Sequence, residues 1–180
     1  LGLIPTFLLS SLCWGEALSD KAAVLYERSR PSIFQLRVVD LSTGKKSGLG
    51  SGFYISAQGD FITNYHVVAE YVMRPEQHSI EYVTADGAAT PLSLLYIDVV
   101  HDLALLRSEA APSAFLQLSD TPPVQGERMF SLGDPYDLGF MIVEGTFNGL
   151  MKKSRYRKYL FSGSLNPGMS GGPAINHAGH

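Results

Sequence analysis

The sequence predicts an all-β fold built from antiparallel strands. From residue 32 onward, short segments rich in β-branched and aromatic residues are separated by turn signals such as Thr43-Gly44, Gln58-Gly59-Asp60 and Asp86-Gly87. This spacing favours an antiparallel barrel or sandwich over βαβ units.

The predicted strands form two series, which indicates two β units. A Pro/Ser-rich break at residues 119–127 separates them. We place the boundary so that the units cover residues 20–119 and 120–180. The predicted strands of the first unit are 32–41, 48–56, 60–64, 79–85, 91–100 and 103–107. Those of the second are 128–133, 140–151, 158–164 and 172–176.

The composition is that of an ordinary soluble globular protein. The chain has 180 residues, of which 45% are hydrophobic and 17% charged, and its formal net charge is −3. This length can bury a core without disulfide bonds. Nothing in the overall charge indicates nucleic acid as a main partner.

Residues 1–19 have the pattern of a secretory signal peptide that lacks its basic start. Leu1 to Leu12 carries no charge and is too short to span a bilayer, and the small residues Ala17 and Ser19 have the spacing that signal peptidase reads. We therefore expect an exported protein, periplasmic or secreted, with no stable membrane span in the mature chain. The alternative is an apolar helix buried in the fold. A helix stopped before Pro31 is expected after Asp20.

Cys13 is the chain's only cysteine and lies within the predicted signal. We therefore expect no disulfide in the mature protein. A lipid anchor on Cys13 is disfavoured by the bulky Leu12 before it.

Ser170 lies in the stretch "NPGMSGGP", where three glycines and two prolines surround it. Glycine lets the backbone take a positive φ and come close to a ligand, and proline stiffens its surroundings. The stretch is either a plain tight turn or a loop that presents Ser170 as a nucleophile. A serine hydroxyl needs a base for that role.

His66 is the best candidate for that base among five histidines, because it follows a predicted strand where one helical turn begins. His78 and His101 lie in polar, loop-like surroundings, and the other two lie in the C-terminal tail. A base histidine needs a buried acceptor, and Asp102 directly precedes the apolar run 103–106. The alternatives are a solvated histidine and a cap or turn aspartate.

Two other motifs match other chemistries, but each lacks the sequence context that its chemistry needs. "GMSGG" fits the nucleophile elbow G-x-S-x-G, but no Asp or Glu follows Ser170 as that fold requires. "GLGSG" at 48–52 precedes a strand rather than a helix, so a strand that permits close backbone packing is favoured over a nucleotide loop. No ligand pair with a recognisable metal spacing occurs, and we expect neither metal nor cofactor.

The stretch "KKSRYRK", Lys152 to Lys158, holds five of the chain's 14 Lys and Arg residues. Most runs of this kind are solvated hairpin loops. Binding an anionic surface and gating the nearby site are the alternatives.

These blocks resemble the trypsin-like serine proteases, and within them the HtrA/Deg type. "GSGFYIS…GDFITNYHVV" is similar to the family's histidine block, "HDLALL" to its aspartate block and "NPGMSGGPAIN" to its serine block. "FSLGDPYDLG" resembles the segment that opens the family's second barrel. The expected lack of disulfides fits the HtrA branch.

The resemblance implies two antiparallel β-barrels and a serine endopeptidase that acts through an acyl-enzyme. It implies that Ser170 is the nucleophile, His66 the general base and Asp102 the residue that orients His66. The backbone N–H groups of Gly168 and Ser170 would form the oxyanion hole. Unfolded or damaged polypeptides are the implied substrates, and a homotrimer is a possible assembly.

The sequence departs from the family pattern in three places. Met169 and Tyr65 replace the family's Asn or Asp before the serine and its smaller residue before the histidine. Only "GGPAINHAGH" follows Ser170 and the sequence shows no PDZ domain, so the chain looks truncated and we expect the second barrel to be incomplete at its C-terminal side. The rival interpretations are a catalytically inactive binding or chaperone module and a non-peptide acyl hydrolase.

Overall fold

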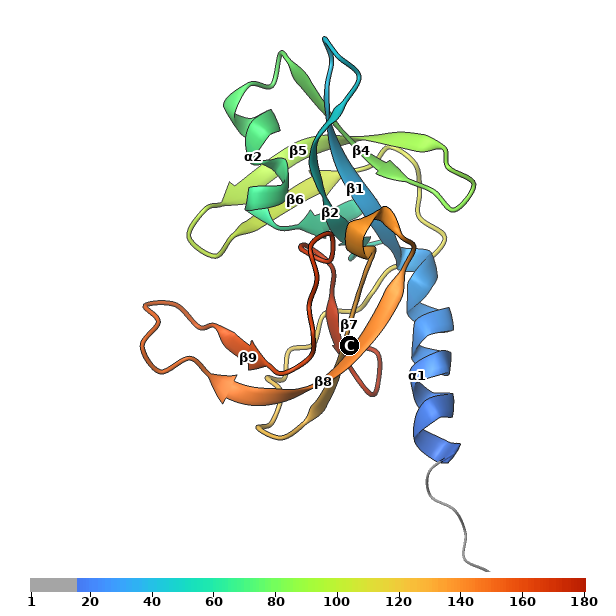
Figure 1. Cartoon of the computed structure of the whole chain (residues 1–180), viewed down its shortest axis with the longest axis vertical. Helices are drawn as coiled ribbons and strands as arrows, with labels where there is room; N and C mark the ends of the chain where they lie inside the picture. The colour runs from blue at the N-terminus through green and yellow to red at the C-terminus, as the bar shows by residue number, and fades with distance from the viewer. Residues whose placement is uncertain (1–15) are drawn as a thin grey trace, which may run out of the picture.

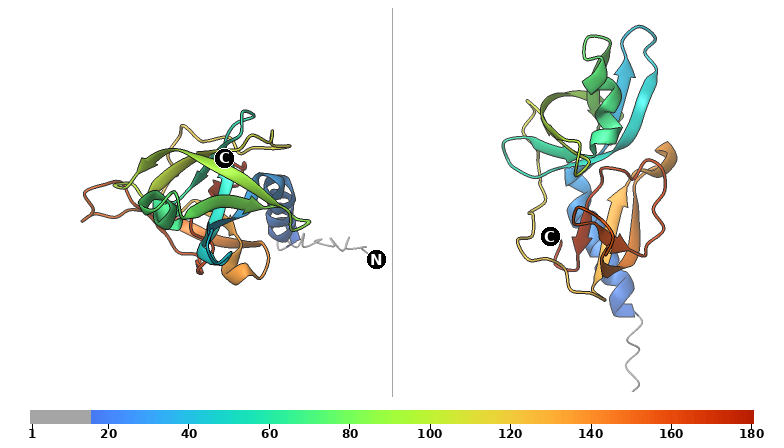
Figure 2. Two further views of the ribbon diagram at one scale, coloured as in Figure 1. Left: turned by 90° about the horizontal axis from the view of Figure 1, so that it is seen from above. Right: turned by 90° about the vertical axis from the view of Figure 1, so that its left-hand side faces the viewer.

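The computed structural model describes residues 16–180 and shows two β units stacked along the long axis of the molecule (Figure 1). The first fifteen residues of the predicted signal, including Cys13, lie outside the described residues. Helix α1 (Glu16–Ser29) runs beside the second β unit (Figure 2). It begins four residues before the predicted start, and a short 3-10 helix, η1 (Arg30–Ser32), joins it to the first strand.

The first unit is a closed six-stranded antiparallel barrel. Its strands are β1 (Ile33–Asp40), β2 (Lys46–Tyr54), β3 (Asp60–Thr63), β4 (His78–Val83), β5 (Ala89–Asp98) and β6 (Leu103–Arg107). Their order around the barrel is β1-β2-β3-β6-β5-β4. The predicted barrel of the first unit is therefore confirmed.

The alternation of side chains along β1 explains how the barrel contacts the second unit. Leu36 and Val38 point into the barrel core, whereas Ile33 belongs to a second buried cluster outside it. The amide of Gln35 donates a hydrogen bond of 2.8 Å to Oδ2 of Asp134 in the second unit. One strand therefore contributes to both cores.

The second unit is a four-stranded antiparallel sheet in the order β10-β7-β8-β9. Its strands are β7 (Arg128–Gly133), β8 (Met141–Leu150), β9 (Tyr159–Phe161) and β10 (Ala174–Asn176), and the 3-10 helix η2 (Pro135–Asp137) follows β7. Among residues 16–180 these strands do not close into a second barrel. The prediction of an all-β chain is confirmed.

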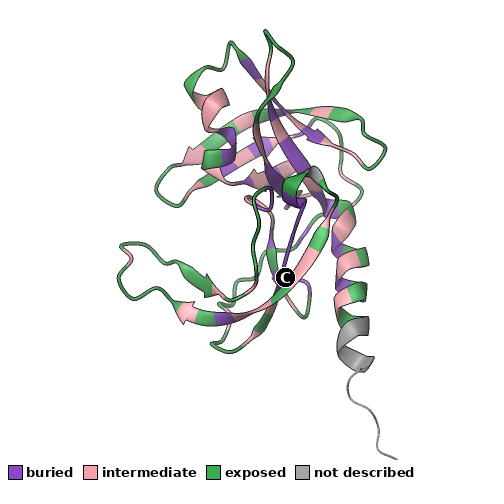
Figure 3. Cartoon of the chain, viewed as in Figure 1, coloured by how far each residue is buried: buried purple, intermediate pink, exposed green. Residues whose placement is uncertain are grey.

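The core of the second unit is formed together with other parts of the chain. Its cluster joins Phe130, Leu132 and Ile175 of the sheet to Leu25 of α1, Ile33 of β1 and Leu116 of the connecting segment. Figure 3 shows burial concentrated in the barrel and where the two units meet, while β9 and the hairpin before it are largely exposed. Neither described α-helix is long and apolar enough to cross a membrane.

Helix α2 (Tyr65–Met73) follows β3 and is longer than the single turn that the sequence predicts. It is anchored because Val67 and Val68 are buried in the barrel core. His78, expected in a loop, is instead the first residue of β4 and is buried, with its Nδ1 3.0 Å from the carbonyl oxygen of Arg74.

Candidate active site

The structure brings His66 and Asp102 together at one end of the barrel. Nδ1 of His66 lies 2.7 Å from Oδ2 of Asp102, and the backbone N–H of His66 donates to Oδ1 of the same carboxylate at 2.9 Å. His66 is the second residue of α2, and Asp102 directly precedes β6. Two different strand connections therefore supply the pair.

The backbone around Asp102 is held in an unusual conformation. Its φ of 57° lies in the left-handed region, which costs an L-residue about 1–2 kcal/mol but is tolerated by aspartate. The carbonyl oxygen of Asp102 accepts hydrogen bonds from the Asn64 side-chain amide at 2.7 Å and from the Tyr65 N–H at 3.1 Å. These bonds fix the carboxylate relative to the imidazole.

The His66–Asp102 pair is more exposed than the sequence interpretation required. The side chains are 54% and 44% exposed, respectively, whereas we expected a buried acceptor. Solvent therefore reaches both groups, so the two hydrogen bonds to the Asp102 carboxylate, rather than burial, define the orientation of the ring.

Ser170 lies on the loop before β10, in a pocket of about 620 Å³. Tyr159 and Phe161 of β9, together with Leu165 and Met169, give the pocket apolar walls, and Asn64 lines it from the first unit. Within residues 16–180, no hydrogen bond joins the Ser170 hydroxyl to the His66 ring. Catalytic hydrogen bonds of this kind are often long in the free enzyme and tighten only when substrate binds.

The backbone before Ser170 forms a tight turn. The Met169 N–H donates to the Asn166 carbonyl at 3.1 Å, and Gly168 has a φ of 96°, as in a type II turn with Pro167 and Gly168 at its centre. A Cβ on Gly168 would lie 2.4 Å from the carbonyl oxygen of Asp134, so only glycine fits.

This turn leaves two backbone donors available beside Ser170. The Pro167 carbonyl accepts from the Tyr136 N–H at 3.0 Å, and a trans peptide points its N–H the opposite way, so the Gly168 N–H faces away from Tyr136. In the part of the chain that the structure describes, neither the Gly168 nor the Ser170 N–H donates a hydrogen bond.

Ser51 of β2 joins the Ser170 loop to the barrel, and the sequence interpretation missed it. Its hydroxyl donates to the Gly168 carbonyl at 2.7 Å and accepts from the Asp134 N–H at 3.0 Å. Its backbone N–H donates to the Ser170 carbonyl at 2.7 Å. The prediction that "GLGSG" permits close packing is confirmed, because a Cβ on Gly50 would lie 2.8 Å from that same Ser170 carbonyl oxygen.

A second His–Asp pair lies on the β5–β6 connection. Nδ1 of His101 is 2.7 Å from Oδ2 of Asp98. The His101 backbone N–H and then its side chain hold the pKa of the Asp98 carboxyl below its ordinary value. Asn64, two residues before His66, shares the pocket with Ser170, and this favours His66 over His101 as the partner of that serine.

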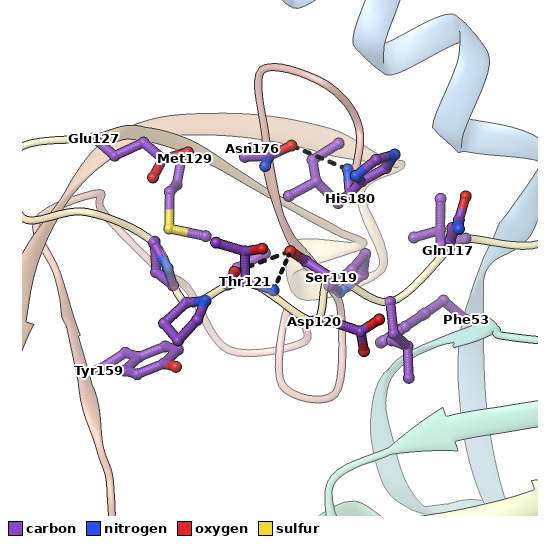
Figure 4. Close-up of a pocket in the computed structure, with 17 residues that line it drawn as sticks. Phe53, Gln117, Ser119, Asp120, Thr121, Glu127, Met129, Tyr159, Asn176 and His180 are labelled. Carbon is purple, nitrogen blue, oxygen red and sulfur yellow. Dashed lines mark hydrogen bonds between the residues drawn. The ribbon is translucent and has the colours of Figure 1, made fainter.

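Another pocket, of about 380 Å³, lies apart from these residues (Figure 4). It is formed by the connecting segment, β7 and β10, and includes His180 but none of His66, Asp102 and Ser170. Across residues 16–180, no group of three His, Cys, Asp or Glu side chains could hold a metal ion.

Comparison with known proteins places this architecture in a family. The model of the trypsin-like peptidase domain matches residues 50–180. The chain belongs to the trypsin-like peptidase domain family. The predicted resemblance is therefore confirmed.

Two relatives of this trypsin-like peptidase domain have protease names. "Probable periplasmic serine endoprotease DegP-like" of Pseudomonas fluorescens is 29% identical over 136 residues, which cover 73% of this chain and 27% of that protein. "Protease Do-like 5, chloroplastic" of Arabidopsis thaliana is 26% identical over 184 residues, which cover 87% of this chain and 57% of that protein. The chain thus spans less than two thirds of either relative.

The fold of the trypsin-like peptidase domain also matches a solved structure. The crystal structure of Deg5 superposes with a TM-score of 0.76 at 22% sequence identity, covering 91% of this chain and 82% of that chain. This likeness supports the shared fold.

Proposed function

We propose that this chain is the catalytic part of a serine endopeptidase that hydrolyses peptide bonds through an acyl-enzyme. The observation that carries the proposal is the 2.7 Å pairing of His66 with Asp102 in a member of a peptidase family. The protease names of the relatives favour this reading over an inactive binding or chaperone module.

In the proposed mechanism, Ser170 Oγ attacks the scissile carbonyl while Nε2 of His66 removes its proton. His66 then gives that proton to the leaving amine, and a water molecule repeats the sequence on the acyl-enzyme. Asp102 accepts a hydrogen bond from Nδ1–H, which fixes the tautomer and stabilises the imidazolium. Asn64 is a positioning residue because its amide holds the backbone of Asp102.

The developing oxyanion would be bound by the backbone N–H groups of Gly168 and Ser170. Both donors are without a partner in the described residues, and Gly168 has the positive φ that turns its peptide. A contact of this kind is worth about 3 kcal/mol in the transition state.

We further propose that the four-stranded sheet contributes to a second barrel, as the shared fold with Deg5 supports. The boundary between the units at residue 120 stays a prediction. Names of relatives support an extracytoplasmic or organellar site of action, and we propose an exported protein that cleaves unfolded or damaged polypeptides there. The trimer implied by the resemblance is a proposal too.

Labelling by a fluorophosphonate probe tests this function on the full-length protein. Such a probe reacts only with a serine activated by a base and an oxyanion hole, so we expect one adduct, located on Ser170 by peptide mass spectrometry. Ser170→Ala and His66→Ala should each reduce cleavage of an unfolded protein by at least about 10³-fold while leaving the circular dichroism spectrum unchanged.

Other outcomes would contradict the proposed function. Wild-type turnover in either variant would show that the triad assignment is wrong. No adduct on the folded full-length protein would favour the binding or chaperone module, and ester turnover without protein cleavage would favour a non-peptide acyl hydrolase.

A further inference from the structure

The segment between β8 and β9 carries the densest positive charge of the chain. We call residues 152–158 the basic hairpin; its cations are Lys152, Lys153, Arg155, Arg157 and Lys158. Because the whole chain has a net charge of −3 and the basic hairpin contributes +5, the rest carries −8. A local potential of this sign attracts anionic groups from solution.

The cations of the basic hairpin are exposed and unpaired. All five residues are exposed, and within residues 16–180 none of them forms an ion pair. Other cations of the chain do have carboxylate partners: Arg107 bonds Asp60 at 2.7 Å and Arg128 bonds Glu144 at 2.8 Å. The charge of the basic hairpin is therefore available to a ligand.

The basic hairpin contacts the loop that carries Asp102 and adjoins the strand that lines the pocket of Ser170. Tyr156 packs edge-on against His101, with ring centroids 5.2 Å apart, and His101 immediately precedes Asp102. Strand β9 starts directly after the basic hairpin and supplies Tyr159 and Phe161 to the pocket of Ser170. Figure 1 shows the β5–β6 connection and the basic hairpin projecting on the same side of the molecule.

We propose that the basic hairpin is a subsite for acidic residues of the polypeptide bound at Ser170, an inference that rests on the proposed function. An extended peptide advances about 3.3 Å per residue, so residues a few positions from the scissile bond reach beyond the pocket of Ser170. The basic hairpin is the charged surface that continues from that pocket through β9. The endopeptidase would therefore favour acidic polypeptides.

Long, flexible Lys and Arg side chains fit this role. The three lysines attract carboxylates as point charges without demanding one geometry, and the two arginines can pair with them bidentately, so the subsite selects for acidic composition rather than for one residue at one position. Attraction of this kind raises the association rate and lowers KM more than it raises kcat, and salt screens it.

Paired peptides test the subsite on the full-length protein. Two peptides share the residues around the scissile bond, and three flanking residues are Glu in one and Gln in the other; a second pair moves them to the opposite side of that bond. We expect kcat/KM to be about five- to tenfold higher for the Glu peptide of at least one pair at low salt. The difference should shrink in 0.5 M NaCl.

A charge reversal and its matched control locate the effect. Lys152→Glu with Lys153→Glu should abolish the preference for Glu, with cleavage of the Gln peptide and fluorophosphonate labelling unchanged. Lys21→Glu with Lys45→Glu produces the same change in net charge at exposed positions on α1 and on the β1–β2 turn, and should keep the preference. Lys152→Gln with Lys153→Gln provides a milder variant if the reversal disturbs folding.

Several outcomes would overturn the subsite. The first is an equal kcat/KM for both peptides of each pair. The second is an equal loss of the preference for the Glu peptide in the Lys21→Glu, Lys45→Glu control variant. The third is strong binding of anionic vesicles or DNA by the basic hairpin without a preference between the peptides. If neither peptide is cleaved and no labelling occurs, the proposed function fails separately. Fluorescence anisotropy then still decides whether the basic hairpin binds the Glu peptide in preference to the Gln peptide.

Discussion

The two β units position their share of the candidate site in different ways. The first unit is a closed barrel, and the connections that hold His66 and Asp102 both emerge from it. The second unit is an open sheet of four strands, and Ser170 lies on a loop before its last strand. The closed unit is self-supporting, whereas the open unit depends on its neighbours.

The two cores reflect the same difference. Inside the barrel, Phe34, Tyr54, Phe61 and Tyr82 form one aromatic cluster, with Tyr54 and Phe61 edge-on at 5.1 Å. The core of the second unit takes Leu25, Ile33 and Leu116 from outside its own sheet. We expect a closed barrel to relax less around a missing side chain than an open sheet with an exposed neighbouring strand.

Removal of one phenyl ring from each core tests this comparison and has the largest expected effect. Phe61 is completely buried, and Phe61→Ala should lower the free energy of unfolding by about 3–5 kcal/mol. Phe130 is almost as buried in the second core, but Phe130→Ala should lower the free energy of unfolding by less, because the surroundings of Phe130 can collapse partly. Urea denaturation measures both, and an equal or larger loss for Phe130→Ala would contradict the distinction between the two units.

Substitution of Gly168 tests how tightly the Ser170 loop is fixed. Gly126 and Gly168 both have a positive φ, but a Cβ on Gly126 meets nothing within 4 Å, while one on Gly168 lies 2.4 Å from the Asp134 carbonyl oxygen. Gly126→Ala should lower the free energy of unfolding by only about 1–2 kcal/mol, because alanine is strained in the left-handed conformation. Gly168→Ala adds the clash, and we expect roughly 2–4 kcal/mol in urea denaturation.

The same pair of variants separates stability from chemistry. Displacement of the Gly168 peptide should slow fluorophosphonate labelling of Ser170 at least about tenfold, since each oxyanion donor is worth about 10²–10³ in kcat. Gly126→Ala should label at the normal rate. Normal labelling of Gly168→Ala would remove Gly168 from the proposed oxyanion hole.

The strands were predictable because their information is local. Each predicted strand segment overlaps an observed strand, and the bounds of β6 and β7 agree, since turn glycines and side-chain alternation are visible within a few residues. The extent of α2 was not predictable in the same way. Its length depends on Val67 and Val68 packing into the barrel, and local propensity carries no information about that contact.

The candidate residues His66, Asp102 and Ser170 could be selected from the sequence by residue type and order, and the structure pairs the first two. Their exposure and their supporting hydrogen bonds could not be predicted. The bond from Asn64 to Asp102 joins residues 38 positions apart, and the bond from Ser51 to Gly168 spans 117 positions. Only the folded arrangement of the two units shows that Asn64 and Ser51 support the site.

Ser51 offers the finest test of the comparison, because it joins the closed unit to the loop of the open one. Its buried hydroxyl links the Gly168 carbonyl to the Asp134 N–H, and alanine leaves both groups without that partner. Ser51→Ala should therefore lower the free energy of unfolding by about 1–3 kcal/mol. Ser47→Ala is the matched control on the same strand: Ser47 is exposed and donates one long bond of 3.3 Å to the Val38 carbonyl, so about 0.5 kcal/mol or less is expected.

The effect of Ser51→Ala on peptidase activity should exceed its effect on stability. The His66–Asp102 pair does not depend on Ser51, so at temperatures where the variant stays folded only the Ser170 loop loses its anchor. A displacement of that loop by a fraction of an ångström should lower kcat/KM about 10- to 100-fold, mainly through kcat, and slow fluorophosphonate labelling in proportion. If Ser51→Ala unfolds more easily yet labels and cleaves at the normal rate, the barrel stabilises the loop without positioning Ser170, and the second unit holds its own part of the site.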